Sequence, residues 1–167
     1  MARDLTTLPT SPTMLTALKI RTMIASSTTF QARLNVETVE EAEQRIYVNF
    51  VQDVDALEKP FAIIQMGPTT HDAVAGGVRQ VYLPDGTLKV TFSDNDVNTS
   101  DPGESATDFY NFFETTWQDV LCLSGYNGLP KISRSTAGVP MQSAEENAPG
   151  EIRFWIVDID AEWNYVG

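Results

Sequence analysis

The chain is acidic and has the composition of an ordinary globular protein. Its 167 residues suit one domain with a single hydrophobic core. With 23 Asp and Glu against 11 Lys and Arg, the formal net charge is −12, and such a surface repels nucleic-acid phosphates. One cysteine excludes an internal disulfide, and no apolar run approaches the roughly 20 residues of a membrane span. We therefore expect a soluble protein of a reducing cytoplasm that binds neither nucleic acid nor membrane.

The N-terminal part of the chain predicts an arm followed by a helix. Residues 1–11 are rich in Thr and show no periodicity, so we expect a flexible arm before a single domain at 12–167. Ser11 followed by Pro12 is typical of an N-cap and a first helical turn. These signals predict a helix over residues 12–26.

The next segment predicts a short strand, a short helix and another strand. Residues 30–36 alternate loosely between apolar and polar types, which indicates a strand. Thr38 with Glu41 three positions later has the form of a capping box and predicts a short helix. The β-forming residues at 46–51 predict that this helix is followed by a strand.

The middle of the chain predicts a buried strand and a hairpin. Residues 61–66 form an apolar run between prolines, which is typical of a buried central strand. Residues 81–83 and 88–92 have strand character and flank a turn-forming segment that runs from Pro84 to Gly86. Because proline presets the first turn position and glycine accepts positive φ, we predict a hairpin turn there.

The C-terminal part predicts one long helix and a closing strand. The helix should start at Glu104 and end near Gly125, because large apolar residues recur at spacings of three and four: Phe109, Phe112, Phe113, Trp117, Val120 and Leu121. Residues 131–133 predict a short strand, residues 136–150 a mobile loop, and residues 152–159 a strand covered on both faces.

The element order predicts an α/β chain of the α+β type. We expect a mainly antiparallel mixed sheet with a β-hairpin and two to three helices packed on one side.

The best candidate for a metal site is an acidic loop. Asp94, Asp96 and Asn98 place oxygen ligands at alternating positions, as a calcium-binding loop does. The sixth position is Thr99 where an EF-hand requires glycine, and the twelfth is Ser105 where it requires glutamate. A polar loop that leads into the long helix is the alternative.

Other reactive side chains do not form a recognisable catalytic set. His71 is the only histidine and is expected in a surface loop, and Cys122 is expected as a small buried residue. Asp158 and Asp160 share one face of the last strand and are the only acidic pair that suggests acid–base chemistry, although a polar outer face gives the same pattern. No catalytic residue and no cofactor is assigned.

Taken in order, the chain resembles the tail-terminator or tail-completion proteins of long-tailed bacteriophages. The matching features span about four fifths of the sequence and are patterns of residue type and order: Phe30, residues 42–47, residues 59–64, the Gly86 hairpin, the helix at 109–123 and the Trp155 strand. The acidic loop from Asp94 to Glu104 and the segment 136–150 depart from the family pattern.

The resemblance implies a virion structural protein without enzymatic activity. Such a protomer is made in the host cytoplasm and forms a homo-oligomeric ring in the virion tail, where it ends tube growth and meets the tail-tube and head-connector proteins. A closed ring uses heterologous contacts, in which different surfaces of each subunit meet. No small-molecule substrate is implied. The alternatives from the residues themselves are a calcium-binding adaptor and an enzyme using acidic residues.

Overall fold

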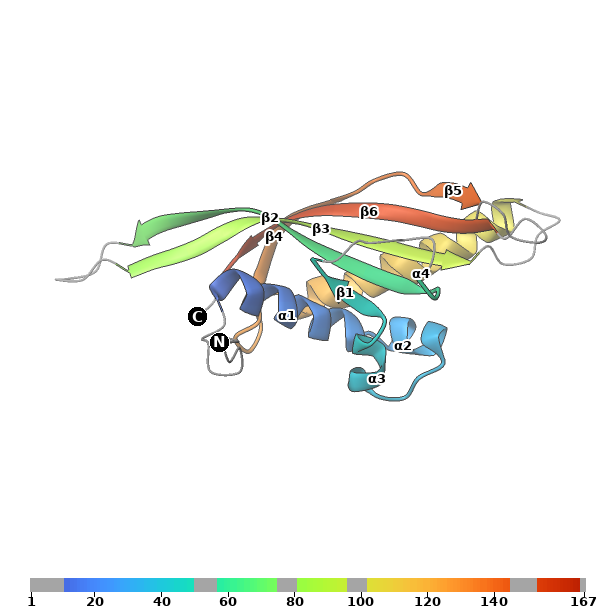
Figure 1. Ribbon diagram of the computed structural model, residues 1–167, viewed down its shortest axis with the longest axis horizontal. Helices are drawn as coiled ribbons and strands as arrows, with labels where there is room; N and C mark the ends of the chain where they lie inside the picture. Colours follow the sequence, from blue (N-terminus) through green and yellow to red (C-terminus); the bar gives the residue numbers. More distant parts are fainter. Residues whose placement is uncertain (1–10, 50–56, 75–80, 96–101, 145–152, 166–167) are drawn as a thin grey trace, which may run out of the picture.

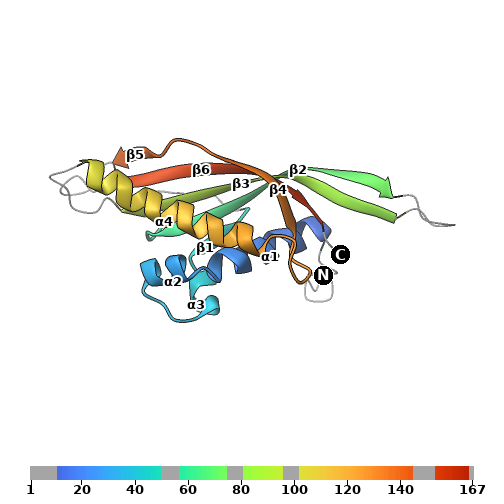
Figure 2. The same ribbon diagram turned by 180° about the vertical axis from the view of Figure 1, so that it is seen from behind.

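One mixed sheet carries all of the described helices on a single face (Figures 1 and 2). The computed structural model describes residues 11–49, 57–74, 81–95, 102–144 and 153–165. The helices are α1 (Pro12–Ala25), α2 (Thr28–Leu34), α3 (Val39–Glu43) and α4 (Pro102–Leu123). The strands are β1 (Ile46–Val48), β2 (Phe61–Val74), β3 (Val81–Asn95), β4 (Lys131–Ala137), β5 (Met141–Ala144) and β6 (Arg153–Asn164).

The sheet has the strand order β1-β2-β3-β6-β4, and β5 pairs with β6 beside β4. Only β1 and β2 are parallel, and all other pairs are antiparallel. The predicted α+β fold with a mainly antiparallel mixed sheet is therefore confirmed, with four helices where two to three were expected.

The first helix forms where its capping signals predict it. The Ser11 hydroxyl accepts a hydrogen bond from the Met14 N–H at 3.1 Å, and Pro12 occupies the first turn. The predicted arm at 1–11 lies outside the described residues except for Ser11.

The strand predicted at residues 30–36 is wrong, because this segment lies mostly in α2. Ser27 caps the helix through a hydrogen bond from the Phe30 N–H, and Phe30 is fully buried between the rings of Phe92 and Phe112. A cap and one deeply buried aromatic ring thus override a weak alternation of side chains.

The capping box of α3 is present as predicted. The Glu41 N–H donates to the Thr38 hydroxyl and the Thr38 N–H donates to the Glu41 carboxylate, both at 3.2 Å. The strand that follows covers only Ile46–Val48 of the predicted 46–51. Asn49 adopts a left-handed conformation with φ of 53°, and residues 50 and 51 lie outside the described part of the chain.

The predicted buried strand begins β2, where Phe61, Ala62, Ile63 and Ile64 are all buried. Alternate residues along the sheet point to two faces. We call the face that packs on the helices the inner face and the opposite one the outer face.

The hairpin turn predicted from Pro84 to Gly86 is wrong. Both residues lie inside the continuous strand β3, where Gly86 pairs with Thr69 and Pro84 with His71. Proline fits because its carbonyl accepts from the Tyr165 N–H, so its nitrogen faces the end of β6 and no bond to β2 is lost. His71 is therefore an exposed strand residue and does not lie in a loop.

The two strands extend beyond the rest of the sheet as an arm (Figure 1). Residues 69–74 of β2 pair with residues 81–86 of β3, whereas β6 begins to pair with β3 only at Asp85. We call residues 69–74 and 81–85 the β2–β3 arm.

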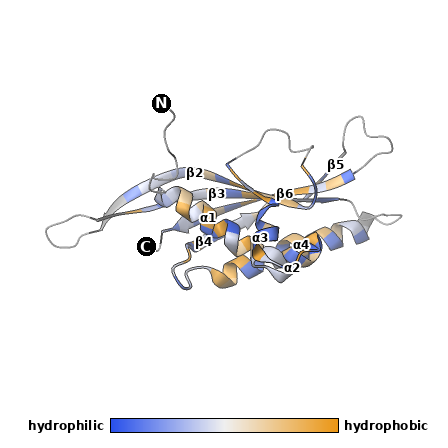
Figure 3. Cartoon of the chain, turned by 60° about the horizontal axis from the view of Figure 1, so that its bottom comes forward, coloured by the Kyte–Doolittle hydropathy of each residue, from blue (hydrophilic) through white to orange (hydrophobic). Residues whose placement is uncertain are grey.

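The long helix is confirmed, and it packs on the inner face through aromatic residues. Apolar and polar positions alternate along α4 (Figure 3), and its buried side chains include Phe109, Phe112, Phe113, Trp117 and Val120. The Phe112 ring lies edge to face against Phe92 of β3 with 6.1 Å between centroids. Gly125 follows the helix with a φ of 73°, as expected of a C-terminal cap.

Two tryptophan N–H groups fasten the ends of α4 to the sheet. Trp155 of β6 donates to the Ser105 hydroxyl at 2.8 Å, and Trp117 donates to the Ser135 hydroxyl of β4 at 3.0 Å. Trp117 is buried and Trp155 is partly buried, and each indole keeps a polar partner, which fixes the helix along the sheet.

The remaining predictions for the C-terminal part have different outcomes. The short strand at 131–133 extends to Ala137, and the loop predicted at 136–150 contains β5, while residues 145–150 lie outside the described part. The last strand is confirmed and continues to Asn164, but its predicted cover on both faces is wrong from Asp158 onward, where exposed outer residues alternate with buried inner ones. Cys122 is exposed, so its prediction as a buried residue is wrong: it lies on the side of α4 that faces away from the sheet.

A β-bulge in β2 depends on the absence of a side chain at Gly86. The register shifts between Met66 and Thr69, and a Cβ on Gly86 would lie 2.6 Å from the Pro68 carbonyl oxygen.

We expect Gly86→Ala to lower the free energy of unfolding by about 1–3 kcal/mol, because the added methyl group forces the backbone apart. Urea unfolding followed by tryptophan fluorescence measures the change. Gly138→Ala is the control, since its Cβ would meet the Asp158 carbonyl oxygen at a milder 3.2 Å. Equal losses in the two variants would contradict the proposed role of the close contact.

Candidate functional site

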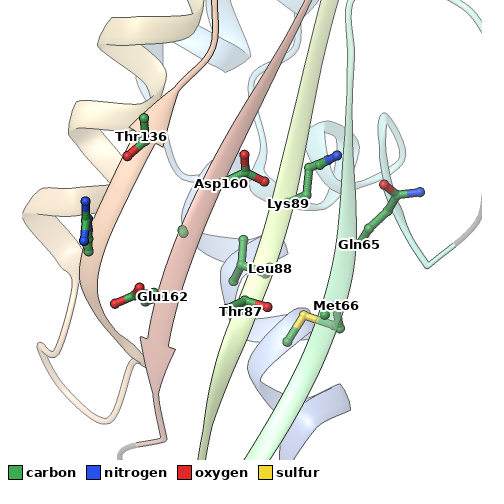
Figure 4. Close-up of a pocket in the computed structure, with 11 residues that line it drawn as sticks. Gln65, Met66, Thr87, Leu88, Lys89, Thr136, Asp160 and Glu162 are labelled. Atoms are coloured by element: carbon green, nitrogen blue, oxygen red, sulfur yellow. The ribbon is translucent and has the colours of Figure 1, made fainter.

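An open groove of about 640 Å³ lies on the outer face of the sheet (Figure 4). Four strands contribute to it, β2, β3, β6 and β4, and the polar side chains that line it alternate with core residues on the same strands. Its lining comprises Gln65, Met66, Gly67, Thr87, Leu88, Lys89, Arg134, Thr136, Asp160, Ala161 and Glu162.

The β-bulge shapes one wall of this groove. A Cβ on Gly67 would lie 2.3 Å from the Thr87 hydroxyl oxygen, so only glycine allows β2 to come this close to β3. The close approach bends the sheet where the arm leaves the body.

The groove combines charges of both signs on neighbouring strands. Lys89 pairs across the sheet with Asp160, and Arg134 of β4 pairs with Glu162. Figure 4 shows Lys89, Asp160 and Glu162 projecting from adjacent strands. The arrangement provides a polar contact surface with several possible hydrogen bonds.

The acidic pair suggested by the sequence does lie on one face, but the groove includes only one of its members. Asp160 lines the groove, whereas Asp158 accepts a hydrogen bond from Thr91 at 2.6 Å and lies 3.9 Å from the Lys89 ammonium. The side chains of Asp158 and Lys89 are 50% and 44% exposed, so water screens this ion pair. The pair is part of a solvated strand face.

The most buried charges lie under the sheet, in a cluster that the sequence reasoning missed. Arg33 of α2 donates through Nε to Asp94 of β3, and through its two terminal nitrogens to Asp108 of α4. The guanidinium also lies 5.4 Å from the centre of the Phe112 ring. One arginine therefore ties a helix, a strand and a second helix together.

Burial raises the pKa of Asp94 above its ordinary value of 3.8, and hydrogen bonds and the positive charge of Arg33 oppose this change. The hydrogen bond to Asp108 contributes most to holding the pKa of Arg33 above its ordinary value. Because folding makes Asp94 a weaker acid, ionising it lowers stability as the pH rises through the acid range, and Arg33 offsets that cost.

The ion pair between Arg33 and Asp94 bears on the predicted calcium site, because Asp94 is one of its three proposed ligands. Asp94 is only 6% exposed and its carboxylate already binds Arg33, while Asp96 and Asn98 lie outside the described residues. A calcium ion would have to compete with the guanidinium for Asp94. Within the described parts of the chain, no group of three or more His, Cys, Asp or Glu side chains could hold a metal ion. The calcium site stays a prediction.

We expect Arg33→Met to lower the free energy of unfolding by about 3 kcal/mol at neutral pH, because it leaves Asp94 buried without a cation. The loss should shrink as the pH falls from about 7 to about 4, since protonated Asp94 needs no counter-ion. Urea unfolding at several pH values measures both effects.

Lys89→Met is the matched control, and it should cost less than about 1 kcal/mol because it removes only an exposed ion pair. A loss for Arg33→Met that does not change with pH would contradict the role assigned to Asp94.

None of the helices in the part of the chain that the structure describes is long and apolar enough to cross a membrane. No protein-family model matches the chain, and no curated protein sequence is significantly similar to it.

Proposed function

We propose that the chain is a structural protein of a bacteriophage virion, similar to tail terminators, that forms a homo-oligomeric ring at the end of the tail tube. In this role it contacts tail-tube subunits on one side and the head connector on the other. The proposal rests on the resemblance of the sequence and on one structural observation, the β2–β3 arm.

The arm is a feature that needs a partner. Two strands paired only with each other are marginally stable in water, because they bury little apolar surface. Among the described residues, residues 81–83 pair with β2 alone, and Leu83 on the arm is 40% exposed. A neighbouring subunit would cover this surface, and an arm that reaches a neighbour is a common way to join copies of one chain.

The one-sided sheet also supports a role in assembly. The described helices cover only the inner face, and the groove of mixed charge on the outer face is open to a partner (Figures 1 and 4). A contact through the arm or through the groove needs no catalytic side chain.

The test is whether the purified protein forms rings. We expect light scattering to give a mass that is a multiple of 18.5 kDa, and negative-stain electron microscopy to show rings that attach to the ends of tail tubes. A protein that stays monomeric at every concentration and does not bind tubes would refute the proposal.

Two exposed leucines allow a matched comparison. Leu83→Asp places a charge on the arm and should weaken ring formation at least tenfold, corresponding to about 1.4 kcal/mol or more. Leu121→Asp makes the same change on α4, where the side chain is similarly exposed at 37%, and should leave assembly unchanged. Assembly that is equally sensitive to both substitutions would argue against the arm as the contact.

A further inference from the structure

The arm has a free backbone edge along β2. β1 pairs only with residues 62–64, and this pairing ends where the Asn49 side-chain oxygen accepts a hydrogen bond from the Met66 N–H at 2.9 Å. Beyond that point, residues 69–74 pair with β3 on one edge and, among the described residues, with no strand on the other.

The direction of the free backbone groups follows from one hydrogen bond. Because the Pro84 carbonyl accepts from Tyr165, Pro84 faces the β6 side of its strand. His71, its partner across the antiparallel pair, must therefore face away from β3. By alternation, the N–H and C=O groups of Thr69, His71 and Ala73 all point to the free side.

The opposite edge of the sheet is β4, which pairs only with β6 among the described residues. The Gly138 N–H donates to the Asp158 carbonyl at 2.8 Å, so Gly138 faces β6. The backbone groups of Ala137 and Ser135 then point away from the sheet, again by alternation. Ile132, nearer the start of the strand, also faces outward, but the Ser124 hydroxyl already binds its N–H at 2.7 Å.

The strand directions make these two edges compatible with each other. β2 is antiparallel to β3, β3 to β6, and β6 to β4, so β4 runs opposite to β2. If β4 of one copy lies beside β2 of another, the alternation of directions continues across the contact. Antiparallel pairing of this kind uses main-chain groups that face no strand among the described residues of each copy.

β4 and the arm also carry opposite charges. β4 carries Lys131 and Arg134 and no acidic residue, in a chain with twice as many acidic as basic residues. On the arm, Asp85 of β3 lies beside the β2 edge, and the residues whose side chains are described, 69–71 and 83–85, include no Lys or Arg. Opposite charges favour contact between the unlike edges over contact between two like edges.

We propose that β4 of one copy adds to the free edge of β2 in the next copy, so that the sheet continues from subunit to subunit. This inference rests on the proposed ring and specifies its contact. Each copy uses both edges once, which is a heterologous contact that can close into a ring. Thr69 and Ile132 lie at one level of the sheet through Gly86 and Trp163, so joining residues 133–137 to residues 69–74 of the next copy displaces the copies along the strands. Closed arrays of strands require such a stagger.

Proline substitutions on the two edges test the proposal. His71→Pro and Ala137→Pro each remove an outward N–H group while leaving every sheet bond of the chain in place. We expect each variant to fold, as judged by circular dichroism and thermal unfolding, but to lose the rings that the unaltered protein forms. His71→Ala and Ala137→Ser retain the N–H groups and should form rings.

Mixing the two proline variants gives the decisive result. The His71→Pro chain keeps an intact β4 edge and the Ala137→Pro chain keeps an intact β2 edge, so an equal mixture should form dimers of one chain of each kind and no rings. Light scattering distinguishes these dimers from the monomers of each variant alone. A folded mixture that stays monomeric overturns the pairing of unlike edges.

A charge exchange provides a second test that does not depend on proline. Reversing the β4 charges with Lys131→Glu and Arg134→Glu should abolish rings, and adding Asp85→Lys to the same chain should restore them at least in part. Rings that persist in the proline variants overturn the inference about the edges but leave the proposed function intact. Monomers of the unaltered protein would overturn the proposed function itself.

Discussion

The packing of the aromatic side of α4 on the inner face of β3 and β6 is the interaction on which the rest of the structure depends. Phe112 joins Phe92 and Phe30 in one contact network, and Phe109 stacks on Trp155 at 6.0 Å between centroids. These rings supply much of the apolar area that holds a helix to a sheet. The described helices all lie on this face, whereas the outer face is buried only in part, at residues such as Phe61, Ile63 and Phe154.

The position of the described helices on one face of the sheet links the fold to the proposed role in assembly. A sheet with helices on both faces offers mainly helix surfaces to a partner. This chain offers a polar groove on the sheet, a projecting pair of strands and two strand edges that face no other strand among the described residues. Proteins that act alone commonly shield such edges, since exposed main-chain groups attract other strands. Here the edges are left open on strands of opposite direction, which is the arrangement that a continuous sheet between copies requires.

Arg33, Asp94 and Asp108 form a cluster in which one cation neutralises a carboxylate buried inside the fold. Asp94 is buried on the inner face, next to an aromatic network that offers it no hydrogen bonds, and Arg33 supplies the missing positive charge. The same guanidinium reaches Asp108 of α4, so neutralising a buried carboxylate also positions α2 against the long helix. An acidic residue that could be taken for a metal ligand thus has a structural partner 61 residues away.

The sequence by itself determined the features that depend on neighbouring residues. Ser11 and the Thr38–Glu41 box mark helix starts because their hydrogen bonds span three residues, and the spacing of Phe109, Phe113 and Trp117 marks one side of α4 because a helix repeats every 3.6 residues. The tertiary structure decided what depends on distant partners. Pro84 and Gly86 continue a strand because β2 and β6 provide its hydrogen bonds, and the residues of the outer groove meet only when four strands align. Local signals fix short-range hydrogen bonds, whereas strand pairing and charge burial depend on which distant segments the folded chain brings together.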